Sequence, residues 1–263
     1  MRTDVSAYLK STVIYPAKII FAISLAEGAE SHEITSFTSD GEPLTPTISL
    51  DHHGTRLHTL MAPAGELVAD YRATVTGASS HTAVEEIDLI RYLRPSRYCE
   101  SDTLTPTAQA EFIGLSGLDL LSAVSSWVGT QLNYIPGFSR PTDGAVSTLL
   151  AREGVCRDYA HLVIALLRAL GMPTRLAAVY APGLDPMDFH AVAEAYVDGA
   201  WHVVDATTLA PRQNMLRIAT GRDAADTAFM DVHSGVAELT NMHVTAVTDD
   251  LATDDVRELV QLN

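Results

Sequence analysis

Three side chains in the second half of the chain have the types and the order of a nucleophile, a base and a residue that orients the base. They are Cys156, His190 and Asp205. A thiolate attacks an amide carbonyl, and an imidazole takes and returns the proton. A nearby carboxylate fixes the imidazole tautomer and stabilises the imidazolium. This combination predicts acyl transfer through a thioester.

The residues after Cys156 have the pattern of an amphipathic helix, which Gly171 and Pro173 would end. Cys156 then lies in or just before the first turn. There, unpaired backbone N–H groups and the helix dipole favour a thiolate and can donate to an oxyanion. The alternative is a small buried hydrophobic cysteine with no reactive role. One apolar row marks the helix: Tyr159, Val163, Leu166 and Leu170.

The dipeptide Asp-Gly at 198–199 predicts a tight hairpin between strands at 189–197 and 200–206. This turn sets the strand register, and side chains alternate between the two faces of a sheet. His190 and Asp205 then share one face as diagonal neighbours, roughly 7–8 Å apart at the backbone. An imidazole and a carboxylate can span that gap. The alternative is a core histidine and a carboxylate that caps the strand end.

The three residues form a triad if the helix end at Cys156 packs against the sheet face that presents His190. Three other side chains are candidates for the substrate cleft. Tyr134 precedes this region and either lines the cleft or packs, and Arg157 has the charge to guide a substrate carboxylate. Trp201 has the parity to wall the cleft on the same sheet face.

The remaining polar residues have ordinary structural explanations. Asp158 suits a helix N-terminus, and His161 lies about 140° around the helix from Cys156, which excludes it as the base. Cys99, in "RYCESD", is expected to pack between the β-rich region and the following core. Three histidines lack a cysteine or acidic partner at ligand spacing, so we expect exposed polar residues and no metal site: His52, His53 and His58.

Composition and charge disfavour several kinds of partner and location. The chain has 263 residues and a formal net charge of −16, which disfavours nucleic acid and anionic membranes as partners. Two cysteines make neither a disulfide framework nor a structural zinc site, although a bridge between them is left open. The N-terminal residues lack a signal-peptide pattern, and the apolar run at 13–26 is too short and interrupted for a membrane span. We therefore expect a cytoplasmic protein.

The pattern along the chain predicts two domains. Residues 1–102 contain β-branched segments separated by turn formers, which is typical of a small antiparallel β-sandwich. Residues 103–263 begin with apolar residues at helical spacing between 118 and 132 and then contain the triad candidates. The acidic C-terminal tail is expected to form a last strand or a frayed helix.

The segments "GVCRDYAHLVIALLRALGMPTR", "DFHAVAEAYVDGAWHVVDAT" and "RYCESD" resemble the transglutaminase-like superfamily, most closely its bacterial cysteine-protease-like branch. The β-rich first hundred residues also resemble the region that precedes the core in bacterial members. The resemblance implies a papain-like α+β core without a cofactor. It further implies that Cys156 is the nucleophile, His190 the general base and acid, and Asp205 the orienting residue.

The resemblance leaves the reaction open, because the superfamily includes cross-linking enzymes, peptidases, amidases and inactive proteins. The chain has no EF-hand-like loop and no apparent room for further β domains, so we do not expect calcium dependence. We expect hydrolysis of a peptide or protein substrate, with transglutaminase or deamidase activity as the alternative. An inactive binding module and a histidine-based metal hydrolase are the other hypotheses. The sequence leaves the oligomeric state open.

Overall fold

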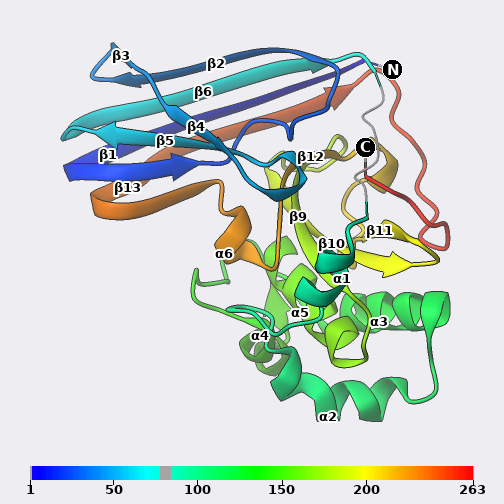
Figure 1. The fold of residues 1–263 in the computed structure, drawn as a ribbon. Coiled ribbons are helices and arrows are strands. Elements are labelled where there is room, and N and C mark those ends of the chain that lie inside the picture. The colour runs from blue at the N-terminus through cyan, green and yellow to red at the C-terminus, as the bar shows by residue number, and fades with distance from the viewer. Residues whose placement is uncertain (1, 78–83, 263) are drawn as a thin grey trace.

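The computed structural model describes residues 2–77 and 84–262 and has a mixed α+β architecture. A large antiparallel sheet lies across the top in Figure 1, helices lie at the bottom, and a smaller sheet lies between them. The α+β class predicted from the sequence is confirmed. The large sheet contains β1 (Thr3–Phe21), β2 (Ser31–Ser39), β3 (Glu42–Leu44), β4 (Thr47–Leu50), β5 (Arg56–Ala62), β6 (Gly65–Val75) and β13 (Met230–Thr248).

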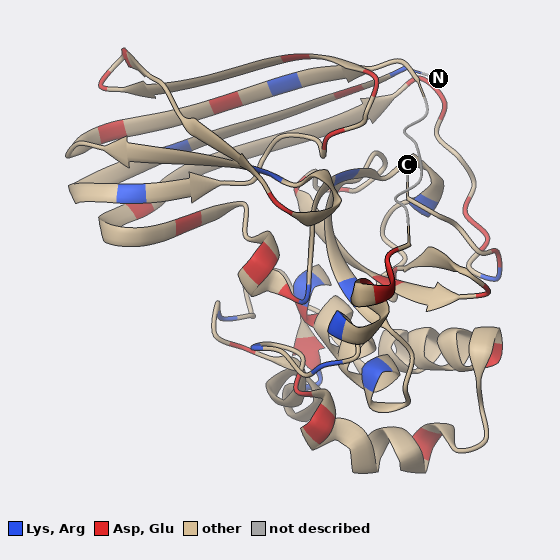
Figure 2. Cartoon of the chain, in the orientation of Figure 1, with Lys and Arg blue, Asp and Glu red and all other residues tan. Residues whose placement is uncertain are grey.

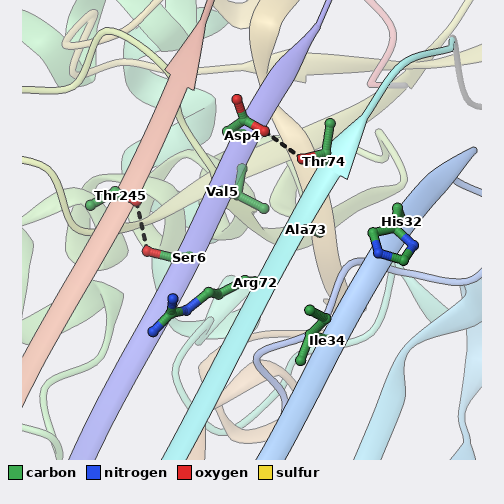
Figure 3. A pocket seen from close by; sticks show the side chains of 9 residues that line it. All are labelled: Asp4, Val5, Ser6, His32, Ile34, Arg72, Ala73, Thr74 and Thr245. Carbon is green, nitrogen blue, oxygen red and sulfur yellow. Dashed lines mark hydrogen bonds between the residues drawn. The ribbon is translucent and has the colours of Figure 1, made fainter.

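The large sheet has the order β3-β2-β6-β1-β5-β4, and β13 pairs with the other side of β1. Alternate residues of β1 are buried, as expected of a sheet with one covered face. Polar residues on its outer face pair across strands: Ser6 hydrogen-bonds Thr245 over 2.7 Å, and the Thr74 hydroxyl donates to Asp4 (Figure 3). This face has a shallow depression that shares no residue with the cavity described below.

Strand β13 departs from the expected division of the chain at residue 102. It lies in the segment assigned to the second domain, yet it pairs antiparallel with β1 from Thr3↔Thr248 to Phe21↔Met230. The large sheet therefore takes strands from both sides of the boundary, whereas the predicted sandwich used residues 1–102 alone. A division into domains 1–102 and 103–263 stays a prediction for the other segments.

The smaller sheet has the order β11-β10-β9-β12, and all its pairs are antiparallel. The predicted hairpin is confirmed: Val197 pairs with Ala200, and the turn residues Asp198 and Gly199 have φ angles of 50° and 86°. These left-handed values explain the Asp-Gly sequence. The strands are β9 (Thr174–Tyr180), β10 (Phe189–Val197), β11 (Ala200–Val204) and β12 (Leu216–Gly221); β7 (Asn133–Tyr134) and β8 (Glu153–Gly154) form a separate parallel pair.

Helix α5 (Cys156–Ala169) is the central helix and is buried continuously from Asp158 to Arg168. It ends close to the predicted glycine: the Gly171 N–H donates to the Arg168 carbonyl, with φ of 83° at Gly171. The other helices are α1 (Glu86–Arg91), α2 (Ser101–Phe112), α3 (Gly117–Gln131), α4 (Ala145–Ala151) and α6 (Ala224–Thr227), with single 3-10 turns at η1 (His52–Gly54) and η2 (Arg212–Asn214).

Among the described residues, no single helix has the length and apolar character of a membrane span. Helices α2 and α3 reach that length only together, with a bend of 102° between them. Both contribute side chains to the apolar core around α5.

Of the three apolar cores among the described residues, two hold the layers together. The first joins α2, α3 and α5 to one face of the smaller sheet, including Ala193 and Ala195. Cys99 is fully buried in this core, which agrees with a packing role. The second core lies between the large sheet and the far end of the smaller one, where Tyr180 and Leu216 contact it. Burial of both faces of the smaller sheet holds it between the helices and the large sheet.

The C-terminal tail forms neither the strand nor the helix that was predicted. Described residues 249–262 have no helix or strand, but they are anchored: the Val203 N–H donates to the Val260 carbonyl over 2.7 Å. The Arg212 guanidinium donates to Asp254 and to the backbone carbonyls of Asp255 and Glu258. The buried Arg212 guanidinium therefore holds the tail in place without regular backbone pairing.

Candidate active site

The β10–β11 hairpin brings His190 and Asp205 together as predicted. His190 Nε2 and Asp205 Oδ2 are 2.7 Å apart, and both side chains are buried. The second carboxylate oxygen accepts the Thr207 N–H and hydroxyl at 2.9 and 2.6 Å. Both oxygens of Asp205 are therefore held, which fixes the orientation of the imidazole.

Electrostatics in this pair favour the imidazolium. Burial opposes the charge on His190, but the Asp205 carboxylate and the neighbouring Cys156 thiol outweigh burial and raise the pKa of His190 to about 10. Burial also opposes ionisation of Asp205. The charge and hydrogen bonds of His190 and Thr207 outweigh it and lower the pKa of Asp205.

Cys156 is the first residue of α5, which places its backbone N–H at the helix N-terminus. Asp158 caps this turn: its carboxylate accepts the Val155 N–H at 2.8 Å and the Ser139 hydroxyl at 2.9 Å. A Cβ at position 154 would come within 2.7 Å of the Asp158 Cβ. Gly154 therefore precedes the cysteine by two positions because the capping carboxylate occupies that space.

The body and the N-terminal end of α5 meet β10 in different ways. The body of α5 packs with Ala193 and Ala195, which have the opposite parity to His190 on β10. Pairing of β10 with β11 begins at Ala193, so the strand around His190 lacks a β11 neighbour. Cys156, at the helix end, approaches His190 where β10 pairs with β9 alone.

Cys156 and His190 line the same cavity, of about 620 Å³. Since Nε2 of His190 binds Asp205, Nδ1 is the nitrogen left for the thiol. Among the described residues, this Nδ1 has no hydrogen-bond partner of ordinary geometry. The arrangement has the elements of a nucleophile, a base with a free nitrogen and a carboxylate behind it.

Two of the three predicted cleft residues lie beside Cys156. Strand β7 holds Tyr134 next to β8, and burial raises the pKa of Tyr134 to about 12, with a smaller opposing effect from the Cys156 N–H at its hydroxyl. Arg157 lines the cavity, but its guanidinium donates to the Ser139 hydroxyl and, over 2.8 Å, to the Arg140 carbonyl. Arg157 thus holds the loop before the helix.

Trp201 does not line the cavity, so its prediction as a cleft residue is wrong. It shares a sheet face with Asp205, as the register required, but four residues along a strand separate them by about 13 Å. Trp201 instead packs 4.2 Å from the Arg175 guanidinium and edge-on to Tyr92. Parity identifies the face of a residue and not its distance along the strand.

The other histidines have structural contacts. His161 is buried, accepts the Ala224 N–H and stacks on Tyr98; burial lowers its pKa to about 3. The prediction that His52, His53 and His58 are all exposed holds only for His52. His53 approaches Asp88 at 3.2 Å, and buried His58 hydrogen-bonds Ser24. The described residues contain no group of three potential metal-ligating side chains.

The sequence reasoning did not identify several cavity residues. Asp188 and Phe189 adjoin His190, and their position in the predicted hairpin was a usable signal. Phe229 and Met230 also line the cavity. The pairing of β13 with β1 brings them to the cavity. The local sequence does not predict the register of that pairing.

Comparisons with known proteins agree on one family. A sequence model described as the transglutaminase-like superfamily matches residues 108–206. The crystal structure of a candidate cysteine protease from Cytophaga hutchinsonii is similar, with 32% identity and a TM-score of 0.86 over 99% of this chain and 96% of that chain. An uncharacterized Mycobacterium leprae protein is 29% identical over 122 residues, which is 43% of this chain and 44% of that protein.

An uncharacterized Mycobacterium tuberculosis protein is 42% identical over 66 residues, covering 25% of this chain and 20% of that protein. The similarity therefore spans less than half the length of these mycobacterial relatives. It reaches nearly the full length of the Cytophaga structure.

Proposed function

We propose that this chain, which belongs to the transglutaminase-like superfamily, is a cysteine peptidase or amidase with Cys156 as its nucleophile. The observation that carries the proposal is the buried His190–Asp205 pair, 2.7 Å apart, whose other imidazole nitrogen, Nδ1, is left for the Cys156 thiol in the same cavity. In this assignment His190 is the general base and acid, and Asp205 orients it.

In the first step, the proton of the Cys156 thiol moves to Nδ1 of His190, and the sulfur attacks the amide carbonyl carbon. The Asp205 carboxylate stabilises the imidazolium that forms, consistent with the raised pKa of His190. The carbonyl electron pair moves to oxygen. The backbone N–H of Cys156, at the start of α5, donates to this oxyanion once the substrate oxygen displaces the Tyr134 hydroxyl, its present acceptor.

In the second step, the oxyanion collapses and the C–N bond breaks. The leaving amine takes the proton from His190, which leaves a thioester on Cys156. His190 then removes a proton from water, the hydroxide oxygen attacks the thioester, and the carboxylic acid leaves as the thiol recovers its proton. Atoms and charge balance without a cofactor.

The same thioester reacts with an amine in a transglutaminase, and a glutamine side chain with water gives deamidation. We rank hydrolysis first because the sequence offers no apparent device that favours an amine over water. A peptide or protein substrate fits the charge better than nucleic acid: Lys and Arg are dispersed among acidic residues in Figure 2, and the net charge is −16. A cytoplasmic location remains part of the proposal.

The test is mass spectrometry of a peptide library that contains Gln and Lys, incubated with and without added amine. Backbone cleavage by the wild type, absent in Cys156→Ala, is the expected result. A mass gain of about one unit on Gln would assign deamidation, and amine adducts would assign cross-linking. Products that persist unchanged in Cys156→Ala would remove Cys156 from the mechanism, and no product with any peptide would favour an inactive binding module.

A further inference from the structure

The cavity that contains Cys156 continues into an apolar space between the two sheets. Beyond the reactive pair, its lining includes Ala178, Ile218, Ala225, Ala228 and Phe229. The alanines are small, so space remains in front of them. The volume of about 620 Å³ is within the range of small-molecule and side-chain binding pockets.

The floor of this space is connected to the base. Phe189 precedes His190 on β10 and stacks on Phe229, with ring centroids 5.1 Å apart. Phe189 also packs against Tyr180 at 5.7 Å. A group resting on this aromatic floor is therefore held next to the imidazole, because Phe189 and His190 are consecutive residues of one strand.

Hydrogen bonds hold the segment 223–229, which carries Phe229 and three alanines of the lining. The Ala22 N–H donates to the Phe229 carbonyl over 3.1 Å, which ties this segment to the end of β1. Asp223 caps α6 by accepting the Ala225 N–H at 2.9 Å, and its other oxygen accepts the Tyr98 N–H at 2.8 Å. The space is thus preformed, which reduces the entropy cost of filling it.

Both acidic and basic side chains line the cavity. Asp188 and Asp231 contribute carboxylates. The two basic groups already have partners: the Ser139 hydroxyl and the Arg140 carbonyl accept from Arg157, and the Asp205 carboxylate pairs with His190. Burial raises the pKa of Asp188, so this carboxylate lies where a negative charge is already disfavoured. A second negative charge from a ligand would be disfavoured further.

We infer that this cavity binds a large uncharged apolar side chain, aliphatic or aromatic, on a residue that flanks the amide attacked by Cys156, and that it rejects acidic side chains. The inference rests on the proposed function and adds the substrate class. Apolar walls favour the burial of such a side chain. The side chain of a flanking residue branches one bond from the reacting amide, which places it in the space adjoining the sulfur.

The experiment varies both residues that flank the cleaved bond in a peptide library and measures relative kcat/KM by mass spectrometry. We expect Leu, Phe or Met to exceed Ala at one flanking position by at least about tenfold, and to exceed Glu by more. Ala178→Phe, which fills the cavity, should reduce the preference for Phe over Ala at least about tenfold. Ala64→Phe, at an exposed site between β5 and β6, is the matched control and should keep the wild-type ratio.

Ala228→Phe, at an exposed position of the cavity lining, is a second cavity-filling variant in case Ala178→Phe does not fold. Iodoacetamide labelling of Cys156 verifies that the reactive pair is intact in each variant. A wild type that cleaves without side-chain preference, or filled variants that keep the wild-type ratio, would overturn the inference while the proposed function stands. A wild type that cleaves nothing would instead count against the proposed function.

Discussion

His190 and Asp205 are joined by a 2.7 Å hydrogen bond between Nε2 and Oδ2, and both are buried at the end of one hairpin. The bond leaves Nδ1 as the nitrogen available to the cysteine. It also couples the protonation of two groups whose pKa values move in opposite directions, with that of His190 raised and that of Asp205 lowered. The proposed chemistry depends on this pair.

Replacement of the carboxylate by an amide tests the orienting role. Asp205→Asn keeps the size of the side chain but cannot stabilise the imidazolium, so we expect kcat to fall by about 10⁴-fold. The pKa of His190 should also decrease from its value of about 10. Steady-state kinetics and NMR titration of the imidazole measure the two effects. Asp102→Asn, at an exposed site in α2, is the control, and a loss in Asp205→Asn of less than tenfold would contradict the assignment.

The pair also predicts a pH dependence of stability. A raised folded-state pKa means that the stabilisation by His190 is complete below its unfolded pKa of about 6.5 and is lost as the pH rises through about 10. The lowered pKa of Asp205 gives stabilisation above about 3.8 that is lost as the pH falls. The unfolding free-energy difference between wild type and Asp205→Asn should therefore shrink from pH 6.5 to 10. Urea unfolding measures it, and a constant difference would argue against the pair.

The hairpin shows how far local sequence can predict this site. The Asp-Gly turn at 198–199 specifies the register, and the register with side-chain parity predicts the contact between His190 and Asp205. The helix that starts at Cys156 is equally local, because its apolar row and terminal glycine lie within a few turns. These features need no knowledge of distant contacts.

The parts that sequence reasoning missed depend on distant pairing. Strand β13 joins β1 across almost the whole chain, and no turn links them to set a register. The seating of the α5 body on the smaller sheet also depends on how both layers pack, and the local sequence does not show that this body contacts Ala193 and Ala195 on the face opposite to His190. The prediction for Trp201 was wrong because contact with the cleft depends on position along the strand as well as on the sheet face.

A single added methyl group at Gly154, two residues before Cys156, should disturb the start of α5. Gly154→Ala places a Cβ 2.7 Å from that of Asp158, so the capping carboxylate must move. We expect the free energy of unfolding to fall by about 1–2 kcal/mol, as for loss of a helix cap, and Cys156 to be alkylated more slowly. Gly114→Ala, where φ of 81° strains an alanine but no atom lies within 4 Å of the new Cβ, is the control: it should lower stability without slowing the alkylation of Cys156. Wild-type alkylation in Gly154→Ala would contradict the capping account.

A buried ion cluster on β10 should dominate the stability of the smaller sheet. Glu194 is fully buried between Arg175, at 2.8 Å, and Arg217, at 2.6 Å. Glu194→Gln leaves two buried guanidinium groups without a countercharge, so we expect a loss of about 3–5 kcal/mol at pH 7. Urea unfolding measures this loss. Glu66→Gln, which breaks an exposed pair with Lys10, should cost at most about 1 kcal/mol.

The pH dependence of Glu194 has a defined sign. Burial opposes its charge, but the two arginines outweigh burial and hold the pKa of Glu194 well below its usual range. Its stabilisation is therefore present above the unfolded pKa of about 4.5 and is lost as the pH falls. The difference between wild type and Glu194→Gln should shrink below pH 4.5. Equal stability of the two proteins at pH 7 would contradict the ion cluster.

The most direct test of the account is the pH profile of iodoacetamide labelling, read at each cysteine by peptide mass spectrometry in wild type and in His190→Gln. We expect Cys156 to be labelled faster in the wild type than in His190→Gln at neutral pH, and the two rates to converge toward about pH 8.5, where an ordinary thiol ionises without a base. Cys99 should stay unlabelled because it is fully buried and burial raises its pKa. Identical Cys156 profiles in the two proteins would contradict the claim that His190 activates the sulfur.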